Sequence, residues 1–181
     1  MLEVERHLFV PKEYQHLAYT DQPLPIGEEQ TISQPYIVAY MLQALQIQGN
    51  EKVLEIGTGS GYVSALLSHL VREVYTVEIR LSLAEKAKAL LQELGIKNVF
   101  FLIGDGLQGW PQHAPYDFIF VSCCLKKIPV SFLEQISENG KIIAPLVWGR
   151  TQKLVLLEKH AGKIKKKELL EVSFVPALAK N

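Results

Sequence analysis

Short apolar runs alternate with helical repeats through the middle of the chain. The pattern predicts strands at residues 52–56, 73–78, 98–103, 116–122 and 140–145, and helices at residues 34–45, 61–71, 81–94 and 129–137. In the helix at 81–94 the apolar stripe consists of Leu83, Ala84, Ala87, Leu90, Leu91 and Leu94. Strands separated by helices are typical of βαβ units, so we expect a doubly wound, mostly parallel α/β sheet.

The C-terminal part of the chain has a different pattern. Two apolar segments, residues 153–158 and 169–174, flank a lysine-rich stretch around Gly162, which predicts an antiparallel hairpin. We interpret Lys163, Lys165, Lys166 and Lys167 as a solvated turn and a charged edge that discourages aggregation, rather than as a nucleic-acid site.

Composition narrows the classes of protein to consider. The chain has 181 residues, of which 48% are hydrophobic and 21% charged, as in a single soluble domain. Nineteen basic residues balance nineteen acidic ones, which argues against a broad surface for nucleic acid or membrane. A charged N-terminus and the lack of a long apolar run predict neither a signal peptide nor a membrane span. We therefore expect a cytoplasmic protein, with a monomer as the default.

The cysteine and histidine residues do not indicate a metal or disulfide site. Cys123 and Cys124 are adjacent and are the only cysteines, and the five histidines lack ligand spacing. We interpret the two cysteines as small buried residues at a strand end rather than as a redox pair. No metal is expected.

The segment Glu55-Ile56-Gly57-Thr58-Gly59-Ser60-Gly61 joins the first predicted strand of the sheet to its helix. Its glycines allow positive φ and close approach of the backbone to a ligand, beside the free N–H groups of a helix start. Glu78 follows Gly57 by 21 residues, the spacing at which a carboxylate meets ribose hydroxyls in doubly wound folds. Taken alone, the glycine segment is equally consistent with an ordinary tight turn.

The spacing of the glycines also bears on the cofactor. A dinucleotide fingerprint needs its last glycine at position 62, where this chain has tyrosine. The pattern E-x-G-x-G-x-G instead resembles the S-adenosylmethionine (AdoMet) site of class I methyltransferases. Ligands in open α/β sheets bind beyond the carboxyl ends of the strands, which adds Gly104-Asp105-Gly106 and Ser122-Cys123-Cys124 to the same edge. Asp105 either faces an adenine amino group or begins an Asx turn.

A second, longer motif is more specific. Residues 23–35, Pro-Leu-Pro-Ile-Gly-Glu-Glu-Gln-Thr-Ile-Ser-Gln-Pro, resemble the signature P-L-P-I-G-x-G-Q-T-I-S-Q-P of protein-L-isoaspartate O-methyltransferases. Further matches at residues 53–61, 104–110 and 174–176 extend the resemblance from Phe9 to Pro176. It implies a Rossmann-like enzyme that uses AdoMet to methylate the free α-carboxylate of L-isoaspartyl residues in damaged proteins or peptides and releases S-adenosylhomocysteine.

The resemblance also implies roles for individual residues. Ser33 is the active-site and substrate-binding serine, and it is also placed to cap the following helix. The cofactor-binding positions are Thr31, Ile32, Glu55, Gly57, Thr58, Gly59, Gly61, Glu78, Ile79, Asp105 and Gly106. We divide the single domain into an N-terminal substrate-side segment with its helix (1–45), a cofactor-binding core (46–145) and the C-terminal hairpin (146–181).

Three departures from the family pattern leave the methyl acceptor open. Glu29 replaces a glycine and places a carboxylate beside the substrate site or in solvent. Lys126 and Lys127 either attract the anionic substrate or are simple surface charge. Ser122-Cys123-Cys124-Leu125 replaces threonine, two alanines and proline, and the segment before Phe9 is short. The alternatives are a methyltransferase acting on another carboxylate or a small molecule, and a catalytically silent AdoMet-binding module.

Overall fold

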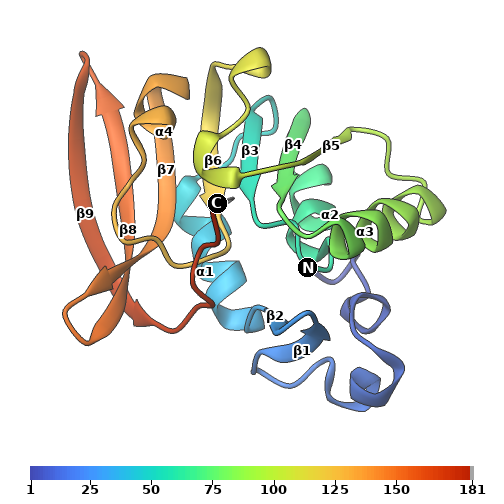
Figure 1. Ribbon diagram of the computed structural model, residues 1–181. Coiled ribbons are helices and arrows are strands. Elements are labelled where there is room, and N and C mark those ends of the chain that lie inside the picture. Colours follow the sequence, from blue (N-terminus) through green and yellow to red (C-terminus); the bar gives the residue numbers. More distant parts are fainter. Residues whose placement is uncertain (180–181) are drawn as a thin grey trace.

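The computed structural model describes residues 1–179 and is built around a seven-stranded sheet (Figure 1). The strand order is β5-β4-β3-β6-β7-β8-β9. The strands are β3 (Lys52–Ile56), β4 (Glu73–Glu78), β5 (Val99–Ile103), β6 (Tyr116–Val121), β7 (Ile136–Trp148), β8 (Thr151–His160) and β9 (Lys163–Val172). The first five strands of the sheet in sequence pair in parallel, and β7, β8 and β9 pair antiparallel. The prediction of a doubly wound, mostly parallel sheet with a C-terminal hairpin is confirmed.

Alternation along the central strands gives the sheet two buried faces. Val53, Val74 and Phe118 belong to one apolar cluster, which they form with residues of α1 (Pro35–Leu45), α2 (Tyr62–Ser68), α3 (Leu81–Glu93) and the N-terminal segment. Their neighbours Leu54 and Tyr75 belong to the other cluster. That second face is covered by α4 (Val130–Gln135) and the short 3₁₀ helices η3 (Gly106–Gln108) and η4 (Pro111–His113). Successive strand residues point to opposite sides, so the continuous apolar runs of these strands place apolar side chains on both faces.

Several element boundaries differ from the sequence prediction. The helix predicted at 61–71 covers only Tyr62–Ser68, and the one predicted at 129–137 ends at Gln135. The backbone becomes extended at Ile136, which pairs with Tyr116, so β7 begins without an intervening loop and is much longer than 140–145. Pairing with a neighbouring strand, rather than local helix propensity, decides where α4 stops.

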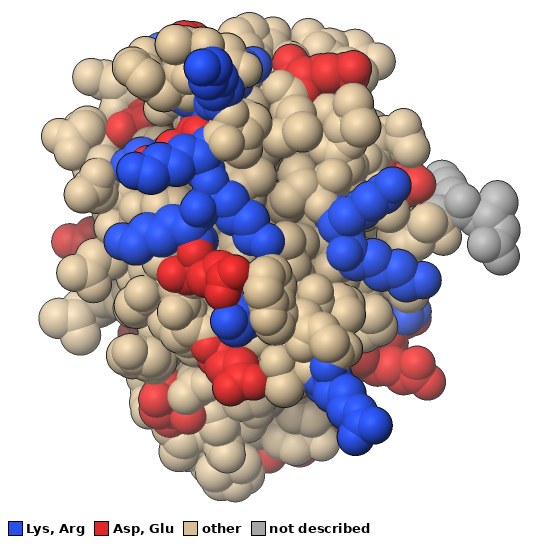
Figure 2. Space-filling model, turned by 90° about the vertical axis from the view of Figure 1, so that its left-hand side faces the viewer, with Lys and Arg blue, Asp and Glu red and all other residues tan. Residues whose placement is uncertain are grey.

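The placement of the C-terminal lysines in a turn was wrong. The turn consists of Ala161 and Gly162, with φ of 49° and 71°, and β8 and β9 pair from His160 and Lys163 onward. The lysines therefore lie on the edge strand β9, where like charges oppose pairing with another chain. Figure 2 shows this side of the molecule, with acidic and basic side chains interspersed. Lys153 and Glu168 form one ion pair there at 2.7 Å.

The segment before α1 is more ordered than the predicted loop. After the 3₁₀ helices η1 (Arg6–Phe9) and η2 (Lys12–Leu17), it forms a hairpin of β1 (Leu24–Gly27) and β2 (Gln30–Ile32). Buried Arg6 holds the segment in place, because its Nε donates to the Ala18 carbonyl at 2.8 Å. The hairpin turn is Glu28-Glu29, with φ of 53° and 58°. Such turns usually carry Asn-Gly, so the residues at this position do not indicate a turn.

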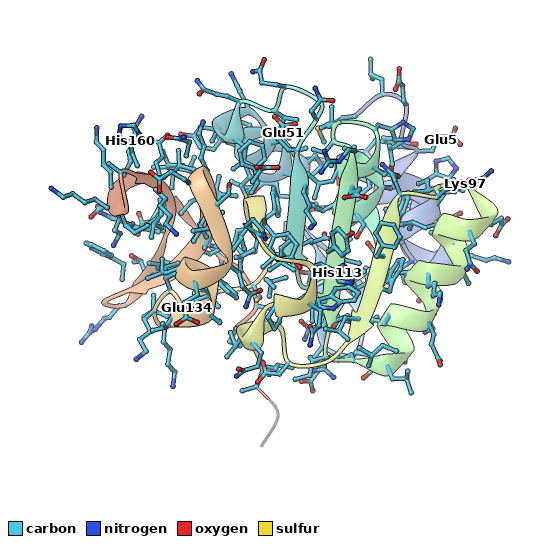
Figure 3. All side chains as sticks on the ribbon, turned by 90° about the horizontal axis from the view of Figure 1, so that it is seen from above. Glu5, Glu51, Lys97, His113, Glu134 and His160 are labelled. Atoms are coloured by element: carbon cyan, nitrogen blue, oxygen red, sulfur yellow. The ribbon has the colours of Figure 1, made fainter. Side chains whose placement is uncertain are left out.

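Two further features of residues 1–179 concern membranes and metals: the length and polarity of the helices, and the grouping of side chains that could bind a metal ion. Within residues 1–179, no helix is long and apolar enough to cross a bilayer. In the same part of the chain, no group of three or more His, Cys, Asp or Glu side chains is arranged to hold a metal ion. Figure 3 shows that His113 and His160 lie over different parts of the molecule.

Candidate active site

The glycine segment forms the floor of a cleft at the carboxyl ends of β3 and β4. Gly57, Gly59 and Gly61 have φ of 88°, 54° and 85°, the left-handed region that favours glycine. A Cβ at Gly61 would come within 2.8 Å of Leu91 Cδ1, so this glycine allows α2 to start against α3. Gly61 thus contributes to packing, while Gly57 and Gly59 expose backbone to the cleft.

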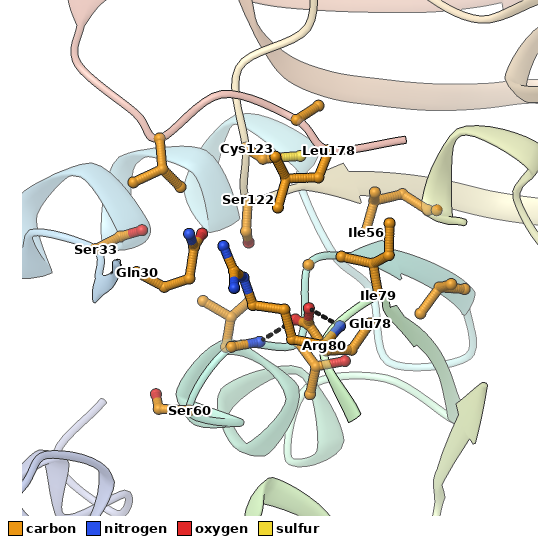
Figure 4. A pocket seen from close by; sticks show the side chains of 18 of the residues that line it. Gln30, Ser33, Ile56, Ser60, Glu78, Ile79, Arg80, Ser122, Cys123 and Leu178 are labelled. Atoms are coloured by element: carbon orange, nitrogen blue, oxygen red, sulfur yellow. Dashed lines mark hydrogen bonds between the residues drawn. The ribbon is translucent and has the colours of Figure 1, made fainter. Parts of the chain in front are cut away.

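Glu78 joins this floor to the end of β4. Its carboxylate accepts hydrogen bonds from the Gly59 N–H at 2.9 Å and the Arg80 N–H at 3.0 Å (Figure 4). Below it, the hydroxyls of Thr58 and Thr76 share a hydrogen bond of 2.6 Å. A carboxylate with four acceptor positions still has lone pairs for a ligand after these two bonds. The glycine segment and Glu78, the two landmarks of the sequence, are thus in direct contact.

The cleft brings together most of the residues singled out from the sequence. Those that line it are Thr31, Ile32, Ser33, Gly57, Thr58, Gly59, Glu78, Ile79 and Gly106. They come from the β1–β2 hairpin and from the ends of β3, β4 and β5. They meet because the carboxyl ends of neighbouring parallel strands lie at one edge of the sheet.

Two acidic residues expected at the cofactor do not line the cleft. Glu55 is fully buried beneath the glycine segment, where the Ser64 hydroxyl donates to its carboxylate. Burial raises the pKa of Glu55 to about 7. Asp105 accepts a hydrogen bond from the Leu107 N–H at 2.9 Å and caps η3, as in the Asx-turn alternative. The sequence pattern could not show that the neighbouring Gly106, and not Asp105, faces the cleft.

Lys126 is exposed and does not line the cleft or the groove that adjoins it, which corrects its expected place at the substrate site. The chain turns into the sheet after β6, where Leu125 donates its N–H to the Pro145 carbonyl at 2.9 Å. This anchor directs the following lysines outward.

A larger groove of about 610 Å³ opens from the cleft. The two cavities share Thr31, Ser33, Ser122 and Val175. The groove is further lined by Arg150 from the β7–β8 turn, by Thr151 and Gln152 at the start of β8, and by residues 171–174. Gln152 fixes this wall, because its amide exchanges hydrogen bonds of 3.0 Å and 2.7 Å with the backbone of Phe174. Sequence reasoning missed these residues, because a polar hairpin turn carries no binding signal by itself.

Ser33 lies at the junction of the two cavities and does not cap α1. The N-cap position is Gln34, which makes no capping bond with its side chain. Asp21 instead accepts the Tyr36 N–H at 2.9 Å, so the helix start is satisfied from a distant part of the chain. This leaves the Ser33 hydroxyl free of the capping role considered from the sequence.

The cysteines after β6 are unpaired, and Cys123 lines the cleft. Burial raises the pKa of the Cys123 thiol to about 12. The thiol is therefore neutral at pH 7, and the thiolate needed for nucleophilic or redox chemistry is disfavoured. The expectation of two small buried residues holds for Cys124, whereas Cys123 is only partly buried.

Comparison with known proteins decides the family. A family model described as protein-L-isoaspartate(D-aspartate) O-methyltransferase matches residues 1–181. The chain belongs to the protein-L-isoaspartate O-methyltransferase family. The resemblance inferred from residues 23–35 is confirmed.

Members of the protein-L-isoaspartate O-methyltransferase family are similar over nearly the whole chain. A relative of this name from Gloeobacter violaceus is 49% identical over 177 residues, which is 97% of this chain and 86% of the relative. One from Dictyoglomus turgidum is 48% identical, over 97% of this chain and 80% of the relative.

Among solved structures, a protein-L-isoaspartate O-methyltransferase superposes with a TM-score of 0.91 at 34% identity, over 98% of this chain and 59% of the other. A second, from Plasmodium falciparum and described as a complex with S-adenosyl-L-homocysteine, has a TM-score of 0.84 at 24% identity, over 99% and 88%. At 24% identity, this second structure supports the assignment of the fold alone.

Glu29, which departs from the pattern of the protein-L-isoaspartate O-methyltransferase family, lies exposed at the tip of the β1–β2 hairpin. Its neighbour Glu28 accepts hydrogen bonds from the Ser82 hydroxyl at 2.7 Å and from Arg80 Nη1 at 3.1 Å. These contacts lower the pKa of Glu28, the Ser82 bond most. They tie the hairpin to the start of α3, across the side of the cleft that Arg80 lines.

Proposed function

We propose that this chain transfers a methyl group from AdoMet to the free α-carboxylate of L-isoaspartyl residues in damaged proteins or peptides, which makes it a protein-repair enzyme. The observation that carries the proposal is the junction at Ser33, where a cleft with a glycine floor and the Glu78 carboxylate opens into a groove of about 610 Å³. Membership of the family agrees with both halves of this arrangement.

The residues of the cleft fit AdoMet. Glu78 has acceptor positions left for ribose hydroxyls, and Ile79 and Gly106 offer apolar and backbone surface beside it for an adenine ring. A Cβ at Gly57 would lie 3.6 Å from Ser122 Cβ, so any larger residue would narrow the cleft between the ends of β3 and β6. When bound, AdoMet supplies an electrophilic methyl group on a positively charged sulfur.

The chain itself needs to supply alignment rather than a base. An α-carboxyl group in water has a pKa of about 3.3–3.7, so the acceptor is already ionised at neutral pH. We assign Ser33 as the hydroxyl that donates a hydrogen bond to the acceptor carboxylate and fixes its direction of approach. Ile32 and Val175 add apolar surface beside Ser33, and a less polar surrounding strengthens the attraction between the opposite charges.

The groove has room for a peptide acceptor. It extends from Pro23 and Ile37 on one side to the β7–β8 turn and residues 171–174 on the other. Arg150 provides a positive charge at the turn, which suits an acceptor that carries carboxylates.

We also propose that the enzyme acts as a cytoplasmic monomer. Cys123 and Cys124 are free thiols, as expected in a reducing compartment. Sedimentation of the purified chain tests the monomer, since a second species of twice the mass at micromolar concentration would contradict it.

The test of function uses labelled AdoMet with paired peptides that contain isoaspartate or normal aspartate at one position. Selective formation of base-labile methyl esters on the isoaspartyl peptide is the expected result. Ser33→Ala should lower kcat/KM about tenfold or more, and Ser137→Ala, a serine outside both cavities, should not.

Equal labelling of both peptides, or labelling only of a small carboxylate, would replace the proposed acceptor. Binding of S-adenosylhomocysteine without any methyl transfer would instead identify a silent AdoMet-binding module.

A further inference from the structure

The side chain of Ser122 makes no hydrogen bond within residues 1–179. It follows β6 directly, and its N–H donates to the Ile56 carbonyl at 2.9 Å, which fixes its backbone beside the glycine segment. Its Oγ is buried and has no hydrogen-bond partner within residues 1–179. An unpaired buried hydroxyl is costly, and natural proteins keep few of them without a reason.

The position of Ser122 indicates where a group that hydrogen-bonds to its hydroxyl would bind. The residue lines both the cleft and the groove, as Ser33 does. Figure 4 shows the Ser122 hydroxyl pointing into the cavity, while the Ser33 hydroxyl faces the same space from the opposite side. The two serines come from different walls, one from the end of β6 and the other from the segment between β2 and α1.

The chemistry of the cleft indicates what kind of group it receives. Arg80 Nε, which also lacks a partner within residues 1–179, is the other such buried atom on the lining of the cleft. This nitrogen is a hydrogen-bond donor, and a serine hydroxyl can also donate. A bound group that accepts hydrogen bonds would therefore satisfy both. A carboxylate has two oxygens and is therefore suited to one donor from each side.

We propose that Ser122 is a second acceptor-binding residue, whose hydroxyl donates to one oxygen of the substrate carboxylate while Ser33 donates to the carboxylate from the opposite wall. The inference rests on the proposed function. Two donors on different walls restrict rotation of the carboxylate, so the attacking oxygen is held on the line of transfer. The same pair discriminates against acceptors that place only one oxygen at the junction.

The test compares Ser122→Ala with Ser122→Thr, which keeps the hydroxyl, and with Ser137→Ala as a half-buried serine outside both cavities. Three quantities are measured for each: kcat/KM for an isoaspartyl peptide, the Kd of S-adenosylhomocysteine, and the Kd of the peptide for enzyme saturated with S-adenosylhomocysteine. Thermal unfolding reports whether each variant is folded.

We expect Ser122→Ala to lower kcat/KM about 10- to 100-fold and to weaken peptide binding, with the Kd of S-adenosylhomocysteine changed less than about twofold. Ser122→Thr should retain activity within about threefold of the unaltered chain, and Ser137→Ala should match it. In Ser33→Ala/Ser122→Ala, the losses should not add, because both hydroxyls act on one carboxylate.

Three outcomes would overturn the inference. Unchanged kinetics of Ser122→Ala would show that the hydroxyl is not used. A parallel loss of S-adenosylhomocysteine affinity would assign the hydroxyl to the cofactor. Equal losses in Ser122→Ala and Ser122→Thr would show that shape, not the donor, matters. Failure of the proposed function is distinct, because the unaltered chain would then not methylate the isoaspartyl peptide at all.

Discussion

The cleft and the groove meet at Ser33 and Ser122 but are assembled in different ways. The cleft is formed largely where neighbouring parallel strands end, so its parts are fixed by the sheet. The groove joins residues near 23–37, 122, 150–152 and 171–175. The pairing of β8 with β9 holds Gln152 beside Val172, but no single edge of the sheet holds all four segments. A cofactor site can thus be specified by short motifs, while an acceptor site depends on how distant segments pack.

The largest expected effect concerns Glu55, the buried carboxylate beneath the cleft. Its pKa is raised from 4.5 to about 7, so the folded state prefers the protonated form. The stability it contributes is fully present below pH 4.5 and is lost as pH rises through 7, a change of about 3 kcal/mol. Glu55→Gln should therefore gain stability relative to the unaltered chain by about this amount between pH 5 and pH 9. Urea unfolding across that range measures it.

The exposed Glu93→Gln serves as the control for this pH series and should show no such gain. A stability difference between Glu55→Gln and the unaltered chain that is the same at every pH would contradict the titration of a buried carboxylate.

Glu78→Gln should weaken binding in the cleft, because Glu78 lines the cleft and does not line the groove. The amide nitrogen cannot accept from the Gly59 or Arg80 N–H, and the charge available to ribose is lost. We expect the affinity for S-adenosylhomocysteine to fall on the order of 100-fold, since hydrogen bonds to charged groups contribute about 1.5–3 kcal/mol each. Calorimetric titration measures this, and Glu73→Gln at the other end of β4 is the matched control. An unchanged affinity would remove Glu78 from the cofactor site.

Substitutions of Arg150 and Lys126 test which of these two positive side chains contributes to binding of the peptide in the groove. Arg150 lines it and Lys126 does not, although the sequence directs attention to Lys126. Arg150→Ala should raise KM for an isoaspartyl peptide about three- to tenfold at low salt, with less effect at high salt because the charge is exposed. Lys126→Ala should change KM less than about twofold. A larger rise in KM for Lys126→Ala than for Arg150→Ala would show that Lys126, and not Arg150, contributes to binding of the substrate.

The smallest expected effect is at the tip of the hairpin that contributes to both cavities. Glu29 has φ of 58°, where a residue with a Cβ is strained. Glu29→Gly should relieve this strain and offset the greater freedom of glycine in the unfolded chain, for a net change in Tm of a few degrees upward at most. Activity should be retained, because Glu29 is exposed and Glu28 keeps its bonds to Ser82 and Arg80. A large loss of activity would place the Glu29 carboxylate in the substrate site.

Local chemistry accounts for what could be predicted at the cleft. The glycines at 57, 59 and 61 all take positive φ, and Glu78 reaches the backbone of Gly59, as a tight strand-to-helix turn requires. Motif spacing misplaces Glu55, because it does not say which face of a strand carries the ligand. Asp105 is ambiguous in the sequence for a similar reason, since an Asx turn and a ligand contact both call for the same residue type.

The order of strands and helices, the parallel sheet and the glycine segment follow from the sequence alone, because hydrophobic period and glycine geometry act over a few residues. Only the tertiary structure decided that α4 gives way to β7 at Ile136, that Asp21 rather than Ser33 satisfies the start of α1, and that Arg150 reaches the groove. Each of these depends on contacts between residues far apart in the chain. Such contacts form only when the whole apolar core is buried, so no local pattern records them.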